Sequence, residues 1–474
     1  MKKYFLAICA TTILFGSCKK DDPKTVTPPV TSGYTELTGD IAANMTLDAS
    51  KKYLLKGFVY VTKGATLTIP AGTVLMGDKA TKGTLVITRG SKIDAQGTSD
   101  KPVVFTSSQA SGARSQGDWG GVILLGKAPI NPTGGTAKIE GGLTPTSGGK
   151  EEDYIWYGGG DASDNSGIMK YVRIEFAGIA YSPDNEINGL TMGGVGAGTT
   201  LSYIQVYRSG DDAFEWFGGT VNADHLVSTY AWDDDFDTDF GFSGNVQFGV
   251  AHRVATIADQ SGSNGFESDN DANGSTNNPQ VKAVFSNMTI VGPITAGSTG
   301  TFNANYQNAA QIRRNSAQSI RNSVFVGFPV GLYIDGSKGT PTHKNTGDGT
   351  NGQLAFKNNI IAGCTTPWKI NYGTATSAAD TAIWNAFKGQ TSNSTITKAE
   401  DILMQDPNKF SAGVSNTTGR PNFLLKSGSP ASTLATDFTG MPSFFKSVAY
   451  RGAFDASADW TAGWTNWSAE TTAY

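Results

Sequence analysis

Short apolar runs with alternating polar positions, each closed by glycine, fill the chain from Leu54 almost to the C-terminus. Two of them, at residues 67–77 and 85–97, share a Leu-x-Ile pattern and matching glycines. Further runs begin at positions 171, 201, 225, 246, 281, 320 and 356. Alternation with period two is typical of strands, and repeats about 20 to 40 residues apart indicate a solenoid. The pattern predicts an all-β chain folded as a parallel β-helix, with a β-propeller as the alternative.

Two segments near the C-terminus depart from this pattern. Residues 397–410 combine helical spacing with charge, which predicts a short helix outside the coil. The tryptophans at 460, 464 and 467 are expected to form a C-terminal cap over the open end of the coil, where unpaired strand edges would invite aggregation.

The N-terminus has the three parts of a secretory signal peptide. Lys2 and Lys3 precede an apolar run at residues 4–15, and the small residues Gly16 and Ser17 follow it. That run is too short to span a bilayer, which takes roughly 20 residues. We therefore expect residues 1–17 to be a removable signal peptide.

Gly16, Ser17 and Cys18 resemble the lipobox of bacterial lipoproteins, whose cysteine becomes an acylated N-terminus. The resemblance implies palmitate-type acyl chains on Cys18, which anchor a protein stably when more than one is attached. Residues 19–22, KKDD, resemble the surface-export signal of Bacteroidetes lipoproteins. We expect a lipid-anchored protein on the cell-surface side of the outer membrane, with a tether over residues 18–35 and a single β-helix domain over 36–474.

The net charge and the cysteine content bear on the binding partner and on what stabilises the fold. The formal net charge is −4, and losing Lys2 and Lys3 makes it −4 − 2 = −6, which argues against nucleic acid as a partner. Cys9 leaves with the signal peptide and Cys18 is expected to be acylated, so Cys364 has no partner for an intramolecular disulfide. The fold must depend on burial of its apolar core.

Four long motifs, at residues 117–131, 210–227, 233–244 and 459–467, resemble a family of secreted and lipid-anchored bacterial proteins common in Bacteroidetes. The resemblance implies a right-handed parallel β-helix, distantly similar in shape to pectate lyases. It implies no catalytic residue, because the family has no established activity.

Three acidic segments align by a shared phenylalanine, at positions 214, 236 and 266. If these phenylalanines point inward, strand alternation places Glu215, Asp237 and Glu267 in one outward column. Asp212, Asn264 and either Asp234 or Asp235 fall beside the preceding turn. The next rungs are expected to add Arg313, Tyr333 and Asp335 to the same outward face.

Carboxylates one rung apart repel by roughly 3 kcal/mol at an effective dielectric near 20, so something must offset the repulsion. A salt-bridge ladder ending in Arg313 and Arg314, a shared proton, or side chains splayed into water would do so. The other solution is calcium, because oxygen ligands suit it and only three histidines are present for zinc or copper. The candidate calcium ligands are Asp212, Asp233, Asp234, Asp235, Asp237 and Glu267.

Three classes of function remain open. The leading one is a binding or adhesion module for a glycan or an envelope protein, with Trp232, Tyr333 and Asp335 as candidate ligand contacts. The second is a polysaccharide lyase or glycoside hydrolase that uses the outward acids, with Arg313 stabilising charge. The third is an accessory lipoprotein of an outer-membrane transport complex. The candidate acid, base or metal-ligating residues of the enzyme are Glu215, Asp237 and Glu267.

Overall fold

The computed structural model describes residues 33–182, 185–294, 302–373, 376–389, 392–408 and 420–474. The predicted signal peptide (residues 1–17) and Cys18 lie outside these ranges, as does most of the tether. Strand β1 begins at Tyr34, slightly before the predicted start of the domain at residue 36. Among the described helices, none is both long enough and apolar enough to cross a bilayer.

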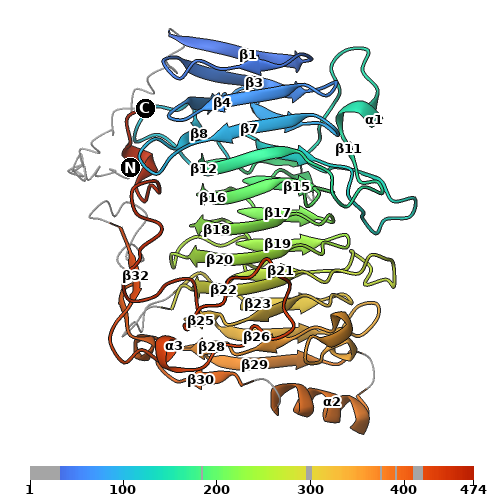
Figure 1. Ribbon diagram of the computed structural model, residues 1–474, viewed down its shortest axis with the longest axis vertical. Helices are drawn as coiled ribbons and strands as arrows, with labels where there is room; N and C mark the ends of the chain where they lie inside the picture. The colour runs from blue at the N-terminus through green and yellow to red at the C-terminus, as the bar shows by residue number, and fades with distance from the viewer. Residues whose placement is uncertain (1–32, 183–184, 295–301, 374–375, 390–391, 409–419) are drawn as a thin grey trace, which may run out of the picture.

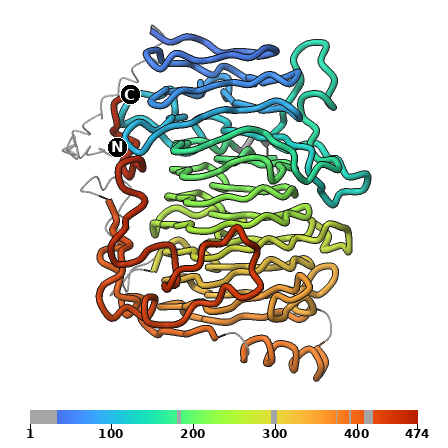
Figure 2. The backbone as a smooth tube through the Cα atoms, in the orientation of Figure 1, coloured from blue at the N-terminus to red at the C-terminus, as the bar shows by residue number. Residues whose placement is uncertain are grey.

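The chain winds into a right-handed parallel β-helix in which 26 strands join in one sheet system (Figures 1 and 2). The coil has three walls, each a ladder of parallel strands from successive rungs. The first wall contains β1 (Tyr34–Ile41), β3 (Lys52–Val61), β5 (Val74–Gly77), β8 (Val103–Ser107), β12 (Gly167–Glu175), β16 (Thr200–Tyr207), β18 (Asn222–Thr229), β20 (Asn245–His252), β22 (Val284–Val291), β25 (Val324–Val326), β28 (Ile360–Ala362) and β30 (Ser394–Ile396).

The second wall contains β2 (Met45–Thr46), β4 (Thr66–Pro70), β7 (Lys92–Gln96), the first halves of β12, β16, β18, β20 and β22, then β24 (Ser319–Arg321) and β27 (Phe356–Lys357). The third wall contains the second half of β3, then β6 (Thr84–Ile87), β9 (Gly121–Leu125), β15 (Leu190–Gly193), β17 (Phe214–Phe217), β19 (Phe236–Asp239), β21 (Phe266–Ser268), β23 (Asn308–Arg313), β26 (Val330–Asp335) and β29 (Thr366–Asn371). The predicted all-β parallel β-helix is confirmed.

Between the second and first walls the long strands bend at a residue in the left-handed region. Tyr171, Tyr203, His225 and Phe248 have φ values of 50°, 57°, 55° and 62°, uncommon for residues with a side chain. Their rings stack outside the coil, with centroids 4.5 Å apart between Tyr171 and Tyr203 and 4.2 Å between Tyr203 and His225. Repetition of the same bend on successive rungs makes this corner a continuous aromatic ridge.

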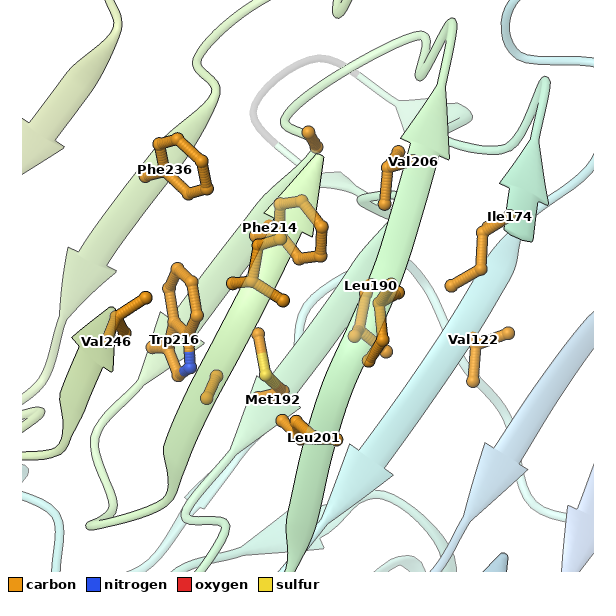
Figure 3. Close-up of a cluster of buried hydrophobic side chains, with 14 of the residues drawn as sticks. Val122, Ile174, Leu190, Met192, Leu201, Val206, Phe214, Trp216, Phe236 and Val246 are labelled. Carbon is orange, nitrogen blue, oxygen red and sulfur yellow. The ribbon is translucent and has the colours of Figure 1, made fainter. Parts of the chain in front are cut away.

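Inside the coil, alternate residues form columns of apolar side chains (Figure 3). Phe214, Phe236 and Phe266 are fully buried and stack on consecutive rungs, with ring centroids 5.7 and 5.2 Å apart. This is the inward register that the three acidic segments predicted. Because the phenylalanines point inward, the acidic residue that follows each of them in its strand points away from the core.

Replacing the middle ring tests how much this column stabilises the coil. Phe236→Leu is expected to lower the free energy of unfolding by about 1–3 kcal/mol, because the ring contacts with Phe214, Phe266 and Phe285 are lost from a packed core. Urea titration monitored by circular dichroism measures the change. Met45→Leu, at a position 37% exposed, is the control and should change the stability by less than about 0.5 kcal/mol. A Phe236→Leu protein as stable as the control variant would contradict the stacking account.

The predicted helix at residues 397–410 is wrong. That segment contains the 3-10 turn η3 (Ala399–Ile402) and then β31 (Met404–Asp406), which pairs with β32 (Asn422–Leu425), while residues 409–410 lie outside the described ranges. Ile402 and Met404 are buried against the side of the coil, which accounts for their apolar character without a helix. A helix forms instead at α2 (Ala378–Gly389), beside the last rungs of the coil (Figure 1). Its Trp384 and Phe387 side chains are part of the apolar core cluster.

The C-terminal tryptophans cover the side of the coil and do not form the predicted cap over its end. The segment after α3 (Pro430–Thr433) runs back towards the N-terminal rungs along one side (Figure 1). Trp464 is fully buried and meets the rings of Tyr171 and Tyr203 edge-on, at 5.9 and 6.0 Å. Beyond it, η4 (Ala469–Thr471) brings Glu470 to an ion pair with Arg208. The aromatic ridge explains this path, because its apolar rings would otherwise be exposed.

The remaining described elements lie in loops outside the coil. They are β10 (Ala137–Lys138), α1 (Glu151–Tyr154), β11 (Trp156–Tyr157), β13 (Ala180–Ser182), β14 (Asn185–Glu186), η1 (Thr342–Asn345) and η2 (Thr350–Gly352).

Candidate metal centre and ligand pocket

Glu215, Asp237 and Glu267, here called the acidic column, lie side by side on the third wall. Strand pairing places Glu215 opposite Asp237, and Asp237 opposite Glu267. The column extends upward to Thr191 in β15 and downward to Gln311 in β23. Each acid is held by inward neighbours on both sides, as Phe214 and Trp216 hold Glu215.

Arg313 does not occupy the position next to Glu267 in the column that the sequence predicts. Gln311 follows Glu267 in the column, whereas Arg313 lies two positions further along β23 and pairs with Asp335. Its guanidinium still reaches back to form an ion pair with Glu267 and donates to Asp269 at 2.9 Å. Arg313 is therefore a cation at the lower end of the acidic column.

The column points away from the core, but its upper part is not exposed to solvent. The loop between β9 and β12 packs on the outer face of the third wall, where Ile130, Ile139 and Tyr157 form a second apolar cluster with Phe217. Glu215 is consequently only 7% exposed. The same loop brings in Glu140, whose side chain interacts with Glu215 and Asn188, while Glu186 lies close enough to affect the Glu140 charge.

A second polar row runs beside the column, at the turn that precedes each strand. The backbone N–H of Asp234 donates to Asp212 Oδ1 at 2.7 Å, that of Asn264 donates to Asp234 Oδ1, and that of Asn308 donates to Asn264 Oδ1 at 3.1 Å. Each side chain thus satisfies the backbone of the next rung. Of the two candidates for this row, Asp234 occupies it.

Asp235 is not a candidate metal ligand, contrary to prediction. It points to the other side of the chain and forms an ion pair with Arg253 at 2.8 Å, in which both side chains are fully buried. Its second oxygen accepts a hydrogen bond from the Ser228 hydroxyl at 2.5 Å. Both carboxylate oxygens are therefore already engaged.

The acids that remain gather into three overlapping groups whose ligand atoms lie within 4.8 Å of one another. The groups are Asp211, Asp212 and Asp233; Asp212, Glu215 and Asp237; and Asp234, Asp237 and Glu267. Three buried oxygens at this place have no hydrogen-bond partner among the described residues: Asp233 Oδ1, Asp237 Oδ1 and Asn188 Oδ1. Asp211 and Asn188 were not among the predicted metal ligands, and Glu215 was one only in the enzymatic interpretation.

Burial and mutual repulsion leave these carboxylates unfavourable as bare anions. Burial, and after it neighbouring carboxylates, raises the pKa of Asp212 and Asp237 well above the ordinary value. Burial also raises the pKa of Asp233 to about 7, and that of Glu267 to about 8 against the opposing effect of Arg313. Buried anions of this kind need protons or a bound cation to neutralise them.

The donors fit a hard cation. All three groups consist of carboxylates, with an amide oxygen from Asn188 nearby and neither histidine nor cysteine in any group. Calcium takes six to eight oxygen ligands of this kind in flexible geometry, whereas zinc and copper prefer nitrogen and sulfur. The unpartnered oxygens of Asp233 and Asp237 belong to different groups, and each is a position at which its own group would hold such an ion.

The three predicted ligand contacts are not brought together. Trp232 lines a cavity of about 370 Å³, here called the Trp232 pocket, with Arg114, Gln116, Arg208 and Glu470. Tyr333 lies on the third wall beneath the ammonium group of Lys369, 4.1 Å from its ring centroid, and Asp335 accepts from the backbone of Ser337. Trp232 is therefore the only one of the three that lines this pocket.

Comparison with known proteins agrees with this architecture. A family model described as a pectate-lyase-like β-helix domain matches residues 39–405. Two similar crystal structures are those of pectate lyase Pel9A (14% identity, 89% of this chain and 84% of that one, TM-score 0.35) and the Dettilon tailspike protein (11% identity, 68% and 62%, TM-score 0.26). No curated protein matches the chain. Because the family model covers most of the coil, the chain belongs to the family of pectate-lyase-like β-helix domains.

Proposed function

We propose that this protein is a calcium-dependent saccharide-binding module of the outer-membrane surface, anchored through acylated Cys18. Membership of the pectate-lyase-like family supports a carbohydrate-related role. The Trp232 pocket has the chemistry that a sugar requires, because an indole ring offers an apolar face and arginine, glutamine and glutamate side chains hydrogen-bond hydroxyl groups.

One observation carries the dependence on calcium. Trp232 donates its indole N–H to Asp259 Oδ1 at 2.7 Å. The Ser261 hydroxyl lies within hydrogen-bond distance of both Asp259 Oδ2, at 2.6 Å, and Asp233 Oδ2, at 2.8 Å. Asp233 belongs to the carboxylate group that also contains Asp211 and Asp212, so an ion there would fix the polar chain that orients the indole ring.

Binding is favoured over turnover because of how the acids are buried. A polysaccharide lyase or hydrolase needs its acid or base at the surface of the groove that holds the polymer. Glu215 is 7% exposed beneath the loop that carries Glu140, and Glu267 is paired with Arg313. The carboxylates therefore suit a structural ion better than proton transfer to a polymer.

The experiment is calorimetric titration of the protein with a panel of neutral and acidic polysaccharides, with calcium and with a chelator. The protein is expected to bind a polysaccharide in the presence of calcium. Affinity should fall at least about tenfold in chelator, and at least about tenfold in the Trp232→Ala variant. A tenfold change corresponds to about 1.4 kcal/mol of binding free energy. Trp156→Ala removes another half-buried indole, on the loop away from the Trp232 pocket, and should bind normally.

Parallel assays follow the appearance of unsaturated or reducing sugar ends. Their release by the protein, lost in Asp237→Asn, would replace the binding proposal with the enzymatic one. Binding that is indifferent to both calcium and Trp232 would also refute the proposal.

A further inference from the structure

A second pocket lies near the N-terminal end of the coil, between the third wall and the loop that carries α1. It has a volume of about 720 Å³ and is here called the N-terminal pocket. Its charged lining comprises the cations Lys63, Arg89, Lys127 and Lys150 and the acids Asp40, Glu152 and Asp153. The local balance is 4 − 3 = +1, in a chain whose formal net charge is −4.

Three of the cations, here called the ladder, follow the ends of strands on consecutive rungs. Lys63 and Arg89 come two residues after the paired ends of β3 and β6, and Lys127, after β9, lies one position beyond the register of Arg89. Neighbouring strands lie about 4.8 Å apart, so three like charges at one corner repel one another, and an anion bound among them would be attracted to all three. The ladder is the basic counterpart of the acidic column, on earlier rungs of the same wall.

The protein neutralises this ladder only in part, through the electrostatic interaction of the Asp164 carboxylate with Lys127. Lys63, Lys127 and Lys150 form no ion pair within the residues that the structure describes. One oxygen of the Asp40 carboxylate is engaged at the pocket wall, where Oδ2 accepts from the Tyr154 hydroxyl at 2.5 Å. Arg89 donates to the carbonyl oxygen of Glu152 at 2.8 Å, which ties the covering loop to the wall and leaves the pocket open between them.

A buried hydroxyl supplies an independent sign of a ligand. Thr62 is 3% exposed and lines the N-terminal pocket, and its Oγ1 has no hydrogen-bond partner. On the next rung the equivalent Thr88 donates its hydroxyl to the carbonyl oxygen of Val61 at 2.9 Å. Leaving a buried polar atom without a partner destabilises the folded protein, and a ligand that hydrogen-bonds Thr62 Oγ1 would remove that penalty.

We propose that the N-terminal pocket binds a sugar that carries a phosphate or sulfate ester. A tetrahedral oxyanion offers three acceptor oxygens, which matches three cations on consecutive rungs better than the two oxygens of a carboxylate. The Thr62 hydroxyl and the acids at the rim suit the hydroxyl groups of the attached sugar. The pocket is separate from the acidic column and from Trp232, so the two proposals stand or fall independently.

Calorimetry with glucose 6-phosphate, glucose 6-sulfate, glucuronate and glucose tests the inference. At least one ester is expected to bind at least about tenfold more tightly than glucuronate or glucose, and the two esters separate phosphate from sulfate recognition. The double variant Lys63→Gln/Lys127→Gln should weaken ester binding at least about tenfold, while Lys92→Gln, an exposed lysine on the second wall, should not. Raising the salt concentration should weaken binding as well.

Thr62→Val separates a ligand contact from a structural role. Valine has nearly the same shape and removes an unsatisfied hydroxyl, so the unfolding temperature should stay the same or rise while ester binding weakens. Equal affinity for glucuronate and the esters, failure of both esters to bind, or full binding by Thr62→Val and by the double lysine variant would overturn the proposal.

Discussion

Calcium is expected to raise the unfolding temperature of this protein, and a chelator to lower it. An ion held by Asp212, Glu215 and Asp237 binds only the folded chain, because the unfolded chain does not hold these oxygens within 4.8 Å of one another. At a free calcium concentration about 1,000-fold above the dissociation constant, the stabilisation is about 4 kcal/mol. Differential scanning calorimetry across a calcium titration measures it.

The pH dependence of the metal-free protein gives a second readout of the same site. Burial raises the pKa of Asp233 to about 7 and that of Glu267 to about 8, so the folded chain binds protons that the unfolded chain releases near pH 4. This contribution to stability is complete below about pH 4 and is lost as the pH rises towards 8. In chelator the protein should therefore become less stable between pH 5 and 8, and calcium should abolish most of that loss.

Asp237→Asn identifies the site responsible. Asp237 belongs to two of the three carboxylate groups and has an unpartnered buried oxygen, so its neutralisation should remove most of the calcium-induced rise in unfolding temperature. In chelator the same variant should be at least as stable as the parent protein, because one like charge is gone. Asp401→Asn, at an exposed position, should leave the calcium effect intact. An unfolding temperature indifferent to calcium would contradict the metal site.

Local pattern was enough to predict the acidic column. Phe214, Phe236 and Phe266 each directly precede an acid. Because successive side chains of a strand point to opposite faces, the phenylalanines face the core and the acids face outward. The local pattern could not predict which of Asp234 and Asp235 lies in the polar row, because a shift of one residue moves a side chain to the opposite face. Only the contact with Arg253, on the following rung, decides between them.

Positions that depend on distant segments could not be predicted in the same way. Ala310 and Ile312 are both buried, so the sequence pattern allows either to align with Phe266. In the structure Glu267 pairs with Gln311, which aligns Phe266 with Ala310. Arg313 therefore lies two positions further along the wall than expected. Glu140 reaches Glu215 from a loop 75 residues earlier in the chain, and nothing in its own segment marks it as part of the site. The covering loop is what converts an outward wall into a buried one, and the alternating pattern of the strands carries no information about it.

Replacing Arg253 by leucine is expected to destabilise the protein by about 3–5 kcal/mol, because it leaves the Asp235 carboxylate buried without a counter-charge. The fully buried guanidinium also donates to the carbonyl oxygens of Ala231, at 2.8 Å, and Asn264, at 2.5 Å, and both would lose a donor. Urea titration at neutral pH measures the loss.

The double variant Asp235→Leu/Arg253→Leu tests whether the uncompensated charge of Asp235 causes this loss of stability. If the cost comes from an uncompensated charge, removing Asp235 as well should restore part of the stability, since apolar pairs replace buried ion pairs at little cost. Burial also raises the pKa of Asp235, so in the Arg253→Leu protein this carboxyl should take up a proton as the pH falls, and the difference from the parent should shrink towards pH 5. A double variant less stable than Arg253→Leu, with a difference independent of pH, would show that the carbonyl contacts of Arg253 matter more than its charge.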